Sequence, residues 1–142
     1  MINTSSTSGL FSNPGQTNYG AAKSGIATFG EIAAKELARY GVRVNSIAPA
    51  ARTRLTLATP GIGEQLAQEV DPSKFDEWDP ANISPLVAWL GAAACKTTGK
   101  TFYVQGGRVG VFKSWHIEKD IDKHDRWDVT ELGASLDKLL ES

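Results

Sequence analysis

Short apolar segments alternate with helical ones along this chain, and this alternation most narrows what it can fold into. Residues 1–5, 42–48 and 101–104 have the composition of buried strands, and they are separated by segments with helical spacing. Strands separated by helices pair in parallel through right-handed crossovers. The sequence therefore predicts an α/β fold with about three parallel strands and flanking helices.

The first predicted helix covers residues 18–40 and stops at Gly41, which is typical of a C-cap. A second helix begins at Asp79-Pro80, where aspartate suits the N-cap and proline the first turn. Residues 50–78 between them are expected to be irregular, with a short helix over 63–70. The spacing of apolar residues predicts two buried sets: Ile26, Phe29, Ala33 and Leu37 on the first helix, and Ile83, Leu86, Val87 and Leu90 on the second.

The end of the chain has a different pattern. Gly106-Gly107 closes the third predicted strand, and the weak alternation at 109–113 predicts an added strand. Asp128 and Glu131 have the spacing of a capping box. They precede leucines at 132, 136, 139 and 140, so a final helix is expected.

Composition excludes several classes of protein. Charged residues make up 22% of the 142 residues, hydrophobic ones 41%, and the net charge is −1, so neither a nucleic acid nor a membrane is an expected partner. Cys95 is the single cysteine, so no internal disulfide forms and a reducing, cytoplasmic location is expected. Met1-Ile-Asn lacks the pattern of a signal peptide, and the apolar run at 85–95 is too short to span a bilayer.

Tyr19 and Lys23 carry the clearest chemical signal. Residues at i and i+4 share a helix face, so the ammonium and the phenol are expected to lie side by side. A neighbouring cation favours the ionised form of a phenol and suits it to proton transfer at neutral pH. Ser6 follows the first strand and is a candidate hydrogen-bond partner for a substrate oxygen. Taken alone, the Tyr-x-x-x-Lys spacing also occurs on ordinary helix surfaces.

The surrounding sequence resembles the short-chain dehydrogenase/reductase family. The matching residues are I-N-T-S-S, G-L-F-S-N-P-G-Q-T-N-Y-G-A-A-K-S-G, R-V-N-S-I-A-P and T-G-K-T-F-Y-V-Q-G-G. The family's catalytic serine, tyrosine and lysine fall on Ser6, Tyr19 and Lys23. The resemblance implies the C-terminal part of a Rossmann-like, doubly wound parallel sheet, and it fades beyond about residue 107.

The resemblance also implies where a nicotinamide cofactor, NAD or NADP, is bound. The expected contacts are Tyr19, Lys23 and, after the second predicted strand, Pro49, Ala50 and Thr53. This turn reads P-A-A-R-T, with alanine where the family usually has glycine and with the threonine one residue early. The alternative role for Thr53 is a helix N-cap. Arg52 and Arg54 are candidates for binding an acyl-CoA phosphate, and the alternative is that both are solvated at the surface.

Parts of the family's pattern are missing here. No G-x-x-x-G-x-G turn stands near the start, and no acidic residue ends a second strand, so NAD and NADP both stay candidates. The sequence is therefore expected to be the C-terminal half of a family member. Its expected parts are a catalytic segment (1–56), a substrate-loop region (50–78), the last helix and strand (79–107) and a C-terminal extension (108–142).

The resemblance implies an NAD(P)-dependent oxidoreductase that transfers hydride between nicotinamide and a small-molecule secondary alcohol or ketone. The P-A-A-R-T turn and the tail look similar to bacterial members related to the dehydrogenase part of multifunctional β-oxidation proteins, which favours a 3-hydroxyacyl-CoA or steroid-like substrate. A complete protein is expected to be a homo-oligomer. The alternative is an inactive fragment or a non-enzymatic oligomer subunit.

The remaining conspicuous side chains have structural interpretations. His116 and His124 lack partners at metal-ligand spacing, so no metal site is expected and both histidines are interpreted as solvated. Cys95 is interpreted as a small buried residue. The four tryptophans are interpreted as core or interface anchors: Trp78, Trp89, Trp115 and Trp127.

Overall fold

The computed structural model describes all residues except 60–61, 68–70, 72 and 142. Within the described residues, a four-stranded sheet has the order β1-β2-β3-β4. The strands are β1 (Ile2–Thr4), β2 (Asn45–Pro49), β3 (Thr101–Gln105) and β4 (Arg108–Val111). The first three pair in parallel, as predicted, and β4 returns antiparallel to β3 across the turn at Gly106, which has a φ of 52°. The added strand at the start of the tail is thus confirmed.

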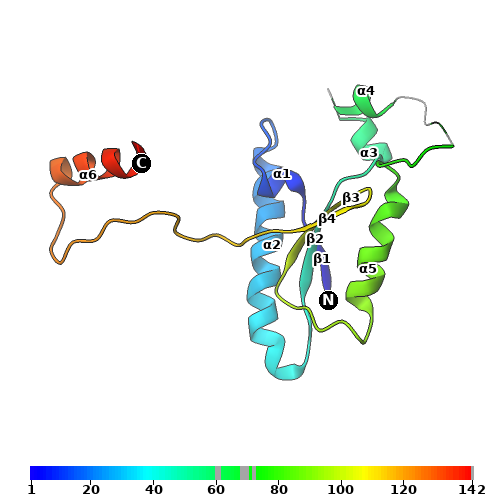
Figure 1. The fold of residues 1–142 in the computed structure, drawn as a ribbon, viewed down its shortest axis with the longest axis horizontal. Helices are drawn as coiled ribbons and strands as arrows, with labels where there is room; N and C mark the ends of the chain where they lie inside the picture. Colours follow the sequence, from blue (N-terminus) through cyan, green and yellow to red (C-terminus); the bar gives the residue numbers. More distant parts are fainter. Residues whose placement is uncertain (60–61, 68–70, 72, 142) are drawn as a thin grey trace.

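Helices cover both faces of this sheet (Figure 1). On one face lies α2 (Thr17–Leu37), which continues as the 3₁₀ turn η1 (Ala38–Tyr40) and ends at Gly41, whose φ of 70° is the left-handed cap that the sequence predicts. On the other face lie η2 (Pro80–Ile83) and α5 (Ser84–Gly91). The carboxylate of Asp79 accepts a hydrogen bond from Ala81 N at 2.8 Å, so the predicted N-cap is confirmed.

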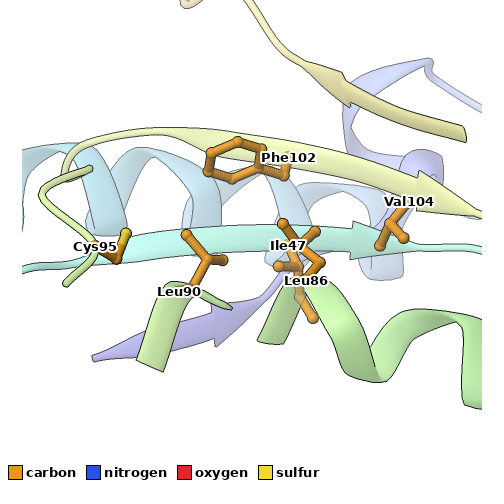
Figure 2. Close-up of a cluster of buried hydrophobic side chains, with 6 residues drawn as sticks. All are labelled: Ile47, Leu86, Leu90, Cys95, Phe102 and Val104. Carbon is orange, nitrogen blue, oxygen red and sulfur yellow. The ribbon is translucent and has the colours of Figure 1, made fainter. Parts of the chain in front are cut away.

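The main hydrophobic core lies between the sheet and α5. Ile47 of β2, Phe102 and Val104 of β3, and Leu86 and Leu90 of α5 point toward one another (Figure 2). The buried Cys95 closes one end of this cluster, which confirms its structural interpretation. The predicted apolar face of α5 is confirmed as well, since Ile83 and Val87 pack against the same core.

The predicted buried face of α2 is wrong at its largest residue. Phe29 is 55% exposed, whereas the buried positions of α2 carry small residues: Ala27, Gly30, Ala33 and Ala34. Small residues allow the helix backbone to approach the sheet closely, and at Gly30 the Ser46 side chain of β2 occupies the space that a Cβ would need. Phe29 and Ile32 are therefore exposed, whereas Leu37 packs against Ala33, Ala34 and Val44, as predicted.

The connections contain short helices that the sequence pattern did not resolve. The segment after β1, predicted as a loop, forms the helical turn α1 (Thr7–Leu10). The 50–78 region contains α3 (Arg54–Leu57) and α4 (Ile62–Leu66). The helix predicted at 63–70 corresponds to α4, which begins one residue earlier than predicted. Its predicted end at 68–70 lies outside the described residues.

The tail leaves the body of the protein as an extended segment and ends in α6 (Val129–Glu141), away from the sheet (Figure 1). Asp128 caps α6 by accepting hydrogen bonds from Thr130 N and Glu131 N, as the capping-box spacing predicts. Trp115 is 88% exposed and is not a core residue, and Trp89 is half exposed while its ring packs edge-on against Phe102 of the core. The alternative role of the tryptophans as interface anchors stays a prediction. In the described part of the chain, no helix is long and apolar enough to cross a membrane.

Candidate active site

The end of β1 brings two serines to the carboxyl edge of the sheet. Ser5 N continues the strand pairing by donating to Ile47 O at 2.7 Å, and the side chains of Ser5 and Ser6 are buried. Ser6 is the N-cap of α1, and its Oγ accepts a hydrogen bond from Ser8 N at 3.2 Å. The Ser6 hydroxyl therefore has an acceptor role in the fold while its proton is available for donation.

Two glycines allow α1 to lie against the first turns of α2. A Cβ on Gly9 would come within 2.6 Å of Ser24 N, and a Cβ on Gly20 within 3.2 Å of Ser8 O. Any larger residue at Gly9 would push the two helices apart. This close crossing places the turn that follows Ser6 beside the helix that carries Tyr19. Both glycines are visible in the sequence, but the contact between them is not local and spacing alone does not predict it.

Tyr19 and Lys23 lie together on α2, as the sequence predicts. Lys23 Nζ is 5.7 Å from the centroid of the Tyr19 ring, which is within the range of a cation–π contact. The same ammonium donates to Thr4 O at 2.9 Å, and Ser5 Oγ donates to Lys23 O at 2.6 Å. The end of β1 thus holds Lys23 through both its side chain and its backbone. Ser5 is a positioning residue that the sequence analysis missed.

Tyr19 is partly exposed to solvent. The residue is 41% exposed, and among the described residues its hydroxyl has no hydrogen-bond partner, Ser6 included. Thr4 and Ser6 lie at the end of β1, and the contact of Lys23 Nζ with Thr4 O brings the Tyr19–Lys23 turn of α2 to this end of the strand. An exposed phenol beside an ammonium is suited to exchanging a proton with an oxygen of a small molecule.

The turn after β2 reaches the same edge of the sheet, because β1 and β2 are parallel. Pro49 ends β2, and Ala50 N donates to Val104 O at 2.9 Å. Thr53 caps α3: its Oγ1 accepts from Thr56 N at 3.1 Å and lies 2.8 Å from Thr56 Oγ1. The alternative role of Thr53 as a helix N-cap is therefore confirmed. The Thr53 hydroxyl oxygen has a second lone pair that can still accept a hydrogen bond from a ligand N–H, whereas donating to a ligand would mean giving up the contact with Thr56 Oγ1.

Arg52 is not a solvated surface residue. Its guanidinium forms an ion pair with Asp76, both side chains are only 20% exposed, and its backbone N–H donates to Trp78 O at 2.7 Å. These contacts fix the β2–α3 turn to the loop before η2. The Arg52 guanidinium, a candidate for binding an acyl-CoA phosphate, is thus paired with the carboxylate of Asp76. Arg54 is exposed and has no such partner among the described residues.

No group of metal-ligating side chains occurs among the described residues, and His116 and His124 are exposed. A cavity of about 560 Å³ lies elsewhere, between α2 and the beginning of the tail, and its lining includes Ile32, Phe112 and Trp115. None of Ser6, Tyr19 and Lys23 lines this cavity.

Comparison with known proteins identifies the family and the fold. A family model described as enoyl-(acyl carrier protein) reductase matches residues 1–108. The chain belongs to the short-chain dehydrogenase/reductase family. The resemblance found in the sequence is thereby confirmed, and so is the Rossmann-like α/β class of the fold.

Three similar dehydrogenases and reductases show how far the likeness extends. The chain is 38% identical over 138 residues to hydroxyacyl-CoA dehydrogenase ChsB1 of Mycobacterium tuberculosis, covering 96% of this chain and 42% of that protein. It is 38% identical over 112 residues to a 3-oxoacyl-(acyl-carrier-protein) reductase of Synechocystis, covering 77% of this chain and 44% of the reductase. A crystal structure of a short-chain dehydrogenase from Mycobacterium avium matches with a TM-score of 0.79 and 45% identity, covering 99% of this chain and 42% of that one.

The chain thus spans less than half the length of these short-chain dehydrogenase/reductase relatives and corresponds to their C-terminal half. Two of the matches extend through the tail, whereas the family model ends at residue 108. The tail is therefore a feature of particular relatives and lies outside the common family core.

Proposed function

We propose that this chain supplies the proton-transfer residues of an NAD(P)-dependent dehydrogenase that interconverts a secondary alcohol and a ketone. The observation that carries the proposal is the Tyr19 phenol beside the Lys23 ammonium, which the carbonyl of Thr4 holds in place at the carboxyl edge of the sheet. Open parallel sheets bind their ligands at this edge. Ser6, which follows β1 at the same edge of the sheet, offers a hydroxyl proton to the same substrate oxygen.

The roles follow from the contacts of each side chain. Tyr19 gives a proton to the ketone oxygen during reduction and takes it from the alcohol during oxidation. Lys23 uses one N–H on Thr4 O, so its two other N–H groups are available for the Tyr19 oxygen and for ribose hydroxyls of the cofactor. Its positive charge stabilises the phenolate that forms when the proton leaves. The bound nicotinamide supplies or accepts the hydride.

The proposed substrate is a 3-hydroxyacyl or 3-oxoacyl thioester. This proposal is supported by the names of the relatives, which act on a hydroxyacyl-CoA and on a 3-oxoacyl carrier protein. The match to the hydroxyacyl-CoA dehydrogenase continues through the tail, whereas the match to the reductase covers 112 residues. A coenzyme A thioester is therefore the favoured form, with the steroid-like acyl chain as a variant of the same class.

A chimera tests this proposal. Residues 1–142 replace the matching C-terminal part of the M. avium dehydrogenase, and NADH formation from a 3-hydroxyacyl-CoA is followed by absorbance. Tyr19→Phe removes the proton donor and should lower turnover by about 10²–10⁴-fold, the usual contribution of general acid–base catalysis. Lys23→Ala should lower turnover and also weaken cofactor binding.

Tyr40→Phe is the matched control, because Tyr40 is an exposed tyrosine beyond the other end of α2 and contacts Arg39. Turnover of the Tyr40→Phe chimera should equal that of the parent chimera. If the Tyr19→Phe chimera keeps the parent turnover while the chemical step limits the rate, the assigned role of Tyr19 is wrong.

A further inference from the structure

The turn after β2 is joined to two other parts of the fold. Ala50 N donates to Val104 O of β3 at 2.9 Å, and Arg52 N donates to Trp78 O at 2.7 Å. The Arg52 guanidinium also forms an ion pair with Asp76. The backbone and the side chain of Arg52 thus both reach the loop before η2, and together they fix the last part of the turn.

Contacts with these neighbours, rather than a glycine, determine the shape of the turn. Among the described residues other than glycine, Ser12 alone has a positive φ, so Ala50 and Ala51 have ordinary backbone conformations. Alanine in place of the family's usual glycine is therefore compatible with this turn. The position of Thr53 then depends on what holds Arg52, the residue before it.

Asp76 is itself held firmly. Its Oδ1 accepts a hydrogen bond from Trp78 N at 3.0 Å, which leaves Oδ2 for the guanidinium. Its backbone carbonyl accepts from Asn82 Nδ2 of η2 at 2.8 Å. A Cβ on Gly106 would lie 3.1 Å from Glu77 Cα, so the β3–β4 turn packs directly on the next residue of the loop. Asp76 is therefore a fixed point against which the turn after β2 is aligned.

The Thr53 hydroxyl can offer a ligand an acceptor but no proton. Thr56 Oγ1 donates its proton to Ala51 O at 3.0 Å. In the 2.8 Å contact between the two threonine hydroxyls, Thr53 Oγ1 must therefore be the donor. Thr53 Oγ1 also accepts from Thr56 N at 3.1 Å, so one lone pair remains. A group that binds this lone pair must carry an N–H or O–H, and the carboxamide of nicotinamide carries N–H groups.

We propose that the Arg52–Asp76 ion pair orients the Thr53 acceptor toward the carboxamide of the nicotinamide cofactor, so that Arg52 and Asp76 are positioning residues of the site. This inference rests on the proposed function, because it requires a nicotinamide cofactor at the carboxyl edge of the sheet. Both charged side chains are only 20% exposed. Removal of either partner leaves the other charge partly buried without its counter-charge, which releases the turn and lets Thr53 move away from the cofactor.

Amide hydrogen exchange of the full 142-residue chain tests the role of the ion pair without a cofactor. Asp76→Asn keeps the shape of the side chain but removes its charge. The Arg52 amide, which donates to Trp78 O, should then exchange at least about tenfold faster, because the turn opens locally. The Ser46 amide, which donates to Lys100 O within the sheet, should exchange as before.

Lys74→Gln is the matched control, because Lys74 and Asp71 form an ion pair in the same region and both side chains are exposed. Exposed ion pairs contribute little to stability, so the Arg52 amide of this variant should exchange at its original rate. An unchanged rate for Arg52 in Asp76→Asn overturns the proposal. Equal acceleration at Ser46 overturns it as well, because the whole fold and not the turn would have loosened.

Cofactor binding gives a readout that a general weakening of the fold would not change. The chimera with the M. avium dehydrogenase is titrated calorimetrically with NAD and with its 3-acetylpyridine analogue, in which a methyl ketone replaces the carboxamide and no N–H remains. The parent chimera should prefer NAD by about fivefold, the contribution of one ordinary hydrogen bond. Thr53→Val, Asp76→Asn and Arg52→Gln should each lose most of this preference, whereas Lys74→Gln should keep it.

The two charged residues should act as one unit. The Arg52→Gln, Asp76→Asn double variant should lose no more of the preference than the more affected single variant, because both substitutions remove the same ion pair. Arg52→Lys keeps a positive charge opposite Asp76 and should retain part of the preference. Additive losses in the double variant would show that the two residues act independently and would contradict the proposal.

The outcomes separate this inference from the proposed function. If Asp76→Asn keeps the preference for NAD while Tyr19→Phe has lost turnover, Arg52 and Asp76 do not position the site and the proposed function stands. If the parent chimera shows no preference, the contact at Thr53 is wrong. If Tyr19→Phe keeps the parent turnover, the proposed function is wrong and the cofactor role of the ion pair falls with it.

Discussion

At Gly30, helix α2 leaves no room for a Cβ against the sheet, and Gly30→Ala is the substitution whose effect the structure defines best. An alanine Cβ at this position would lie 2.4 Å from Ser46 Oγ and 3.3 Å from Asn3 Nδ2. Both of these polar atoms are buried and lack a hydrogen-bond partner among the described residues. Adding a methyl group therefore requires the Ser46 side chain to change rotamer or α2 and β2 to move apart.

Two opposing effects set the size of the change. Overpacking of a close contact costs about 1–3 kcal/mol, while replacing glycine by alanine in a helix gains about 1 kcal/mol. Gly30→Ala should thus destabilise the chain by roughly 0–2 kcal/mol. Gly25→Ala is the matched control on the same helix, because a Cβ at Gly25 meets no atom within 4 Å, and it should stabilise the chain by up to about 1 kcal/mol.

Urea unfolding of the two variants measures the difference directly. The free energies of unfolding should differ by about 1–3 kcal/mol in favour of Gly25→Ala. Both proteins have the same free edge on β1, so any association through that edge affects them alike. Adding Ser46→Ala to Gly30→Ala removes the clashing hydroxyl and should restore most of the loss. Equal stability of the two glycine variants would refute the close-contact argument, as would a failure of Ser46→Ala to restore stability.

Two further outcomes are expected. The hydrogen bond from Lys123 holds the pKa of Glu131 below its ordinary value of 4.5. The contact that anchors α6 should therefore be complete above pH 4.5 and be lost as the pH falls through the lowered pKa. Amide exchange of α6 measures this pH dependence, and Glu131→Gln should remove it. The 142-residue chain alone contains no glycine-rich phosphate turn near its start. Calorimetric titration should therefore give a dissociation constant for NADH weaker than about 1 mM, roughly −4 kcal/mol, and tighter binding would contradict this expectation.

Local signals in the sequence predicted the features that depend on a few neighbouring residues. Helix ends at Gly41, Asp79 and Asp128 follow from single side chains or from glycine's access to positive φ, and they were predicted correctly. The contact between Tyr19 and Lys23 follows from the geometry of one helical turn. The parallel order of β1, β2 and β3 follows from the alternation of strands and helices.

The errors occurred where two segments distant in the sequence meet. Apolar spacing placed Phe29 in the core, but the sheet accepts only small residues on that side of α2 because Ser46 and Asn3 stand there. Arg52 was predicted to be a phosphate ligand or a solvated surface residue, but in the structure it pairs with Asp76, which is 24 residues away in the chain. Residue spacing does not reveal that Ser46 and Asn3 face Gly30, or that Asp76 pairs with Arg52.

The sequence by itself determined the strands, the caps and the residues that carry the proposed chemistry, because each depends on backbone preferences or on side chains within one helical turn. Only the tertiary structure decided how these residues are held. The crossing of α1 and α2 at Gly9 and Gly20, and the hold of Thr4 and Ser5 on Lys23, need strand and helix to be packed together. The start of the tail is likewise held by a contact that spacing does not reveal, because Ser114 Oγ donates to a carboxylate oxygen of Glu31, a residue 83 positions away in the chain.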